Sequence, residues 1–98
     1  TTDSEGEEAS EAYRRTVAIT YEQAYERYLD ASHDLPAAWR DAEAGEDRVL
    51  RLTPDELEAM SGELSAVMDR WSERVAAHTE SDGSEPVVVV MQAYRWVP

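Results

Sequence analysis

Cysteine is absent from this sequence of 98 residues. Disulfide bonds, catalysis by a thiolate, and zinc or iron–sulfur sites with cysteine ligands are therefore excluded for this chain. Lysine is also absent, so arginine alone supplies the nine basic residues that stand against 22 acidic ones, and the net charge is −13. Because this charge repels phosphate groups, we expect no direct contact with nucleic acid or with an anionic membrane.

Long apolar runs are missing as well. No stretch of roughly 18 apolar residues occurs, so we expect no membrane-spanning helix. The first residues lack the basic region and apolar stretch of a secretory signal, and we expect a cytoplasmic location. No serine nucleophile elbow, glycine-rich phosphate loop or zinc-binding helix motif is present. The sequence therefore predicts neither an enzyme nor a cofactor.

Apolar residues make up 42% of the chain, which indicates a folded domain. Residues 1–8 are acidic without an apolar side chain, and they predict a disordered lead-in to one domain over 9–98. Apolar residues then recur at three- and four-residue steps and predict a helix to about residue 33. The stripe consists of Tyr13, Val17, Tyr21, Ala24, Tyr28 and Ala31, widened by Tyr25 and Leu29. Glu11 and Arg15 are spaced for an ion pair on this helix.

The segment Thr53-Pro54-Asp55-Glu56 predicts the start of a second helix. Thr53 and Glu56 are spaced for a reciprocal capping box, and proline is favoured at the first helical position. The apolar spacing continues the helix to about residue 78. Its stripe consists of Leu57, Met60, Leu64, Val67, Met68, Trp71 and Val75. Between the two long helices, residues 36–42 predict a short helical turn that begins at a proline.

Two segments have the pattern of strands. In residues 48–52, Leu50 and Leu52 would share one face of a short strand, and residues 87–97 begin with four consecutive valines. The expected fold is therefore α+β, in the order long helix, short strand, long helix and long C-terminal strand. Because a sheet of two strands is a poor independent unit, we expect a homodimer to complete it, with a compact monomer as the alternative. The expected packing seam consists of Tyr21, Tyr28, Leu57, Leu64, Met68, Trp71, Val88 and Val90.

Aromatic residues outside this seam offer a second interpretation. They are Tyr13, Tyr25, Trp39, Tyr94 and Trp96, and together they could line a pocket for a small-molecule effector. The competing interpretation is a helix-packing core with hydroxyl groups at its rim. For the histidines, His33 and His78, we prefer ordinary polar positions near helix C-termini to a metal site, because 44 residues separate them.

Several motifs are similar to the C-terminal half of ArsR-like winged-helix transcriptional regulators of bacteria. The motifs are Arg48–Met60, Glu63–Leu64, Val67–Arg70 and Glu85–Tyr94, with a weaker match over Ala12–Ala18. The resemblance covers about residues 12–97 and consists mostly of capping and packing signals. Asp55 stands where that family often has glutamate.

This resemblance implies a dimerisation domain that may be ligand-sensing, belonging to a regulator whose DNA-binding winged helix lies upstream, since nothing in this chain has the pattern of that module. It implies that the dimer sets the spacing of those DNA-binding modules. Two alternatives of other classes stay open: a stand-alone acidic protein-interaction module without a DNA role, and a small-molecule binding domain.

Overall fold

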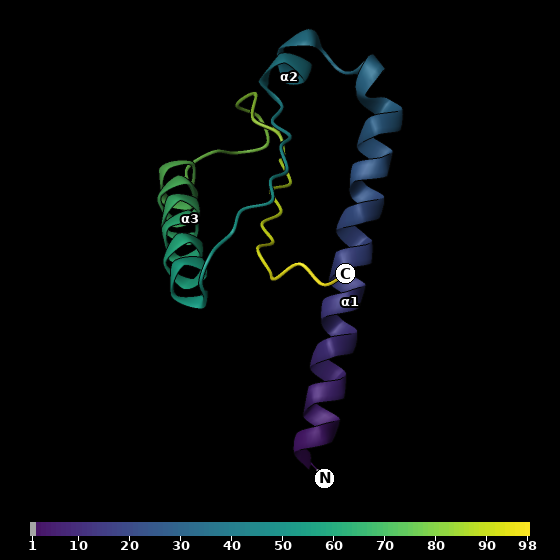
Figure 1. Ribbon diagram of the computed structural model, residues 1–98. Coiled ribbons are helices and arrows are strands. Elements are labelled where there is room, and N and C mark those ends of the chain that lie inside the picture. The colour runs from purple at the N-terminus through teal and green to yellow at the C-terminus, as the bar shows by residue number, and fades with distance from the viewer. Residues whose placement is uncertain (1) are drawn as a thin grey trace. The chain divides into compact units, whose positions relative to one another are not determined.

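The computed structural model describes residues 2–98 and, among them, the side chains from Ser4 onward (Figure 1). The elements are helix α1 (Thr2–Ala31), the short 3-10 helix η1 (Ser32–Asp34), α2 (Ala37–Ala42) and α3 (Pro54–Arg74). The chain divides into two units, Thr1–Asp47 and Arg48–Pro98. The single domain expected over residues 9–98 stays a prediction, because it depends on the assembly of two chains.

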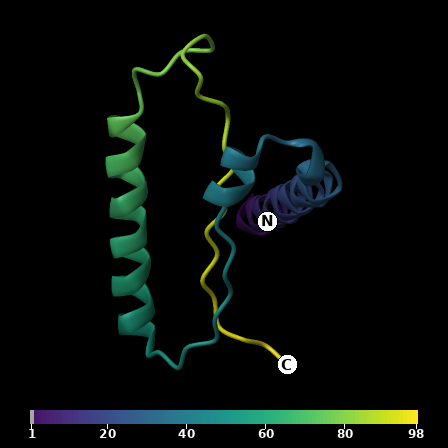
Figure 2. The same ribbon diagram turned by 90° about the horizontal axis from the view of Figure 1, so that it is seen from above.

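The predicted α+β fold is wrong. Among residues 2–98 the regular structure is entirely helical, and neither 48–52 nor 87–97 forms a strand. Within the second unit these two segments run beside each other as extended chain without a β-bridge (Figure 1 and Figure 2). Valine favours strands when its side chain packs on a covered, pleated surface. Val87–Val90 lack that cover, since all four are exposed.

Helix α1 is longer than the sequence predicted. It begins at Thr2 and includes most of the segment expected to be disordered, and Thr1 lies outside the described residues. Glutamate is a good helix former, and acidic side chains at a helix N-terminus are stabilised by the positive end of the helix dipole. These two effects account for a helix that continues through residues without any apolar side chain.

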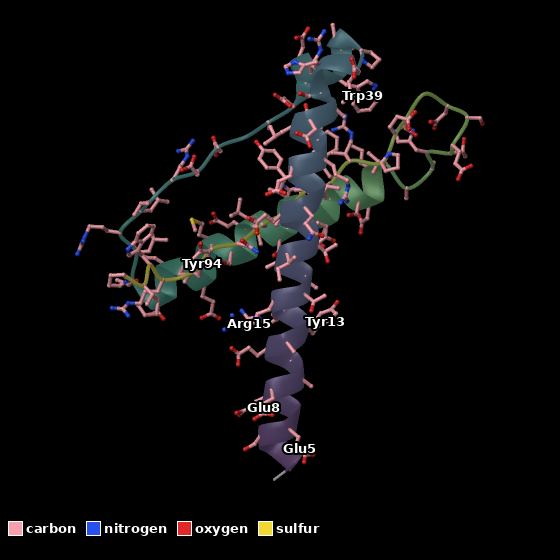
Figure 3. All side chains as sticks on the ribbon, turned by 90° about the vertical axis from the view of Figure 1, so that its right-hand side faces the viewer. Glu5, Glu8, Tyr13, Arg15, Trp39 and Tyr94 are labelled. Carbon is pink, nitrogen blue, oxygen red and sulfur yellow. The ribbon has the colours of Figure 1, made fainter. Side chains whose placement is uncertain are left out.

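The apolar stripe of α1 has the predicted orientation. Val17, Ala24 and Tyr28 are its half-buried members. Tyr13 and Arg15 project from opposite sides of the helix (Figure 3). Arg15 Nη2 lies 2.9 Å from Glu11 Oε1, which confirms the predicted ion pair one turn apart. This pair is exposed to solvent, so its contribution to stability is small.

The connection after α1 is built from short elements. The long helix gives way to η1 over Ser32–Asp34, and α2 begins directly after Pro36, as predicted. The hydroxyl of Tyr28 donates a hydrogen bond to Glu43, which joins α1 to the segment after α2. This bond is a contact between two segments of the first unit that are 15 residues apart in the sequence.

Helix α3 begins where the sequence places it. The Glu56 backbone N–H donates to Thr53 Oγ1 at 3.2 Å, and the Thr53 N–H donates to Glu56 Oε1 at 2.9 Å. Both bonds of the capping box are therefore present, with Pro54 in the first turn. Hydrogen bonding from the Thr53 backbone, and to a lesser extent from its side chain, lowers the pKa of the Glu56 carboxyl. The helix ends at Arg74, about one turn before the predicted end.

Candidate interaction surface

The apolar stripe of α3 is the most regular candidate surface. Its half-buried members are Leu57, Met60, Val67 and Met68, whereas Leu64 and Trp71 are 42% and 49% exposed. No residue among those with described side chains is fully buried. The stripe is therefore an apolar face that is only partly covered in this chain.

Trp71 and Arg74 define the C-terminal end of this face. The guanidinium carbon of Arg74 lies 4.6 Å from the centroid of the Trp71 ring. This cation–π contact orients the arginine along the stripe and keeps its charge at the edge of the apolar surface.

The seam residues of α1 lie in the other unit. Tyr28 is half-buried and Tyr21 is exposed. The rings of Tyr25 and Tyr28 stack with their centroids 6.4 Å apart and an interplanar angle of 14°. The structure thus brings together one residue of the expected seam and one of the expected effector pocket.

The remaining pocket candidates are spread along the chain. Tyr13 and Trp39 belong to the first unit, and Tyr94 and Trp96 to the second. All four are exposed, Tyr13 at 70% and Tyr94 at 75%. Val88 and Val90, from the expected seam, lie exposed on the extended C-terminal segment. An effector pocket formed by these aromatic residues stays a prediction.

Residues 81–86 predict a turn after α3, and the structure forms a turn there, although the sequence did not indicate which side chains bond within it. The Asp82 carboxylate accepts bonds from Ser84 Oγ at 2.6 Å, from the Ser84 N–H at 2.9 Å and from the Thr79 N–H at 3.0 Å. Nδ1 of His78 lies 2.7 Å from Asp82 Oδ2. Gly83 has φ +90°, a conformation that favours glycine. The Asp-Gly pair and an aspartate side chain that bonds the backbone two residues later are recognised turn signals.

These bonds lower the pKa of Asp82 from its ordinary value of 3.8, with the Ser84 hydroxyl as the largest cause. A lowered pKa means that the ionised carboxylate stabilises the folded turn at pH values above 3.8, and that this stabilisation is lost as the pH falls below that value. We expect a ¹³C NMR titration of the Asp82 carboxyl to have its midpoint below 3.8. In a Ser84→Ala variant, which lacks the hydroxyl, the midpoint should move upward. A wild-type midpoint at or above 3.8 would contradict the bonding described for this turn.

The turn does not assemble a metal site. Among the described residues, no group of three or more histidine and acidic side chains is placed to hold a metal ion. A shallow hollow adjoins the turn and is lined by His78, Thr79, Glu80, Ser84, Glu85 and Pro86. No residue of the expected effector pocket lines this hollow.

Comparison with known proteins identifies no protein that is similar to this chain. No family model matches the chain, and neither a curated protein nor a solved structure matches it. The resemblance to ArsR-like regulators therefore stays a prediction. Across the described residues, no helix has the length and apolar character needed to cross a bilayer.

Proposed function

We propose that this chain is a homodimerisation module. The supporting observation is its accessible surface of 9518 Å² for a mass of 11.0 kDa. Two separate compact proteins of half that mass would together expose only about 6,800 Å². The chain thus exposes about 2,700 Å² more than two folded globules of the same total mass.

This surplus, about 2,700 Å² for one chain, slightly exceeds the surface that a chain usually buries in a permanent interface. Obligate homodimers bury roughly 2,000–5,000 Å² in total, which is about 1,000–2,500 Å² for each chain. The exposed surface includes the apolar stripes of α1 and α3 and the valine-rich segment, which are the surfaces that association would cover. A second copy supplies the burial that the isolated chain lacks.

The wider role follows from the sequence resemblance. In ArsR-like regulators a dimerisation domain fixes the separation of two DNA-binding winged helices, and we propose that this module does the same for modules upstream of it, in the cytoplasm. A net charge of −13 supports this proposal, because an acidic domain repels the phosphates of DNA and the DNA contacts would be made by the upstream modules. A small-molecule effector would act by favouring one arrangement of the dimer over another.

Sedimentation velocity over a range of protein concentrations tests the proposal. We expect a species with twice the mass of the chain that dissociates only on dilution. A single-chain mass at every concentration would refute the dimer and favour the acidic protein-interaction module.

A further inference from the structure

Helix α3 has the repeat of a short coiled coil. Its 21 residues make three heptads. One core position is occupied by Leu57, Leu64 and Trp71, and the next by Met60, Val67 and Arg74. A repeat of seven residues keeps these positions on one side of the helix, which is the geometry of a two-helix seam.

A charged flank runs beside this seam with the same period. Glu56, Glu63 and Arg70 are seven residues apart and lie along one edge of the apolar stripe. The charge on this flank changes sign along the helix, from acidic in the first two heptads to basic in the third. In coiled coils, the residues at the edges of the seam choose the orientation of the partner helix.

From this placement we propose that a second copy of the chain docks its α3 antiparallel on this stripe. The inference rests on the proposed dimer and specifies its geometry. In the register that faces residues 57–74 of the two helices, Leu64 packs against Val67 of the partner subunit, and Trp71 packs against Met60 of the partner subunit. Glu63 then lies beside Arg70 of the partner subunit, and the two-fold axis repeats this ion pair.

Charge disfavours the parallel arrangement. Two parallel copies of α3 would bring together the two Glu56 side chains, which lie in the acidic first turn and on the charged flank. They would also leave Glu63 facing an uncharged edge of the partner helix. The antiparallel arrangement sets each acidic first turn near Arg70 and Arg74 of the partner subunit and opposes the two helix dipoles.

Charge reversal tests the orientation. Glu63→Arg or Arg70→Glu alone places like charges together at two symmetric points, and we expect each to raise the dimer Kd about tenfold. The double variant, whose net charge equals that of the wild type, should return to within about threefold of the wild-type Kd. Glu58→Arg makes the same change of charge on the polar face of α3 and should leave the Kd within about threefold.

Cross-linking gives a second measurement, because the natural chain has no cysteine. Chains with Glu63→Cys are mixed with chains carrying Arg70→Cys and treated with a short bismaleimide. Antiparallel helices give mainly links between the two different chains, whereas parallel helices give links between identical ones. A stable dimer that gives mainly links between identical chains would overturn the antiparallel docking. A double variant whose dimer Kd is raised by the product of the two single effects would overturn it as well. Either result would leave the dimer itself unchallenged. A wild-type chain that sediments as a monomer would instead remove the proposed function itself.

Discussion

Leu64→Asp is expected to convert the dimer into monomers. Leu64 occupies the middle of the α3 stripe and is 42% exposed in the isolated chain, and the proposed partner helix would cover the exposed part. The variant places one carboxylate from each chain in an apolar interface without a partner of opposite charge. Because burying such a charge costs several kcal/mol, the dimer Kd should rise at least about 100-fold. Sedimentation velocity measures this change directly.

Val88→Asp extends the test to the C-terminal segment, and Ala66→Asp serves as the matched control. Ala66 is exposed on the face of α3 away from the stripe, so the same added charge there should leave the dimer intact. Val88 is 60% exposed, and its replacement should also weaken association if that segment belongs to the seam. An unchanged dimer in both the Leu64 and the Val88 variant would refute the seam.

Thr53→Ala should destabilise the second unit by about 1 kcal/mol and by no more than about 2 kcal/mol. The threonine hydroxyl accepts a hydrogen bond from the Glu56 N–H in the first turn of α3. Losing the cap leaves that amide to water and frees the first turn to fray. Chemical denaturation followed by circular dichroism, at one fixed protein concentration, gives the change in the free energy of unfolding.

Thr16→Ala is the control for this measurement. The Thr16 hydroxyl donates to the Ala12 carbonyl at 2.9 Å inside α1, where that carbonyl already belongs to the helix. Alanine has the higher helix propensity at such a position, so the free energy of unfolding should stay unchanged or increase slightly. If both variants lost the same stability, the effect at Thr53 would reflect the loss of any threonine and not the loss of a cap.

Features decided within one or two helical turns could be predicted from the sequence. The capping box depends on two residues three positions apart, and the Glu11–Arg15 pair on residues one turn apart. The apolar faces of the long helices follow equally from local spacing, and Val17 and Met60 are half-buried as that spacing requires. Such interactions need no information about the rest of the fold.

The predicted strands failed because a strand is not a local structure. The four valines Val87–Val90 have a high propensity for strands, but a β-ladder also needs a hydrogen-bonded neighbouring backbone and a covered face. Neither is present along the extended segment. The candidate site shows the same division: the α3 stripe was predicted from spacing, whereas the bond from Tyr28 to Glu43 joins residues 15 positions apart and had no local signal.

The acidic start of α1 has a mechanical consequence. A helix of 30 residues is about 45 Å long, and its first two turns carry no apolar side chain. These two turns form the acidic arm of the helix. A neighbouring module attached through continuous helix would be carried by that arm, and each residue inserted into it would advance the module by about 1.5 Å and swing it through about 100°. The number of residues in the arm would therefore set both the distance of that module and its rotation about the helix axis.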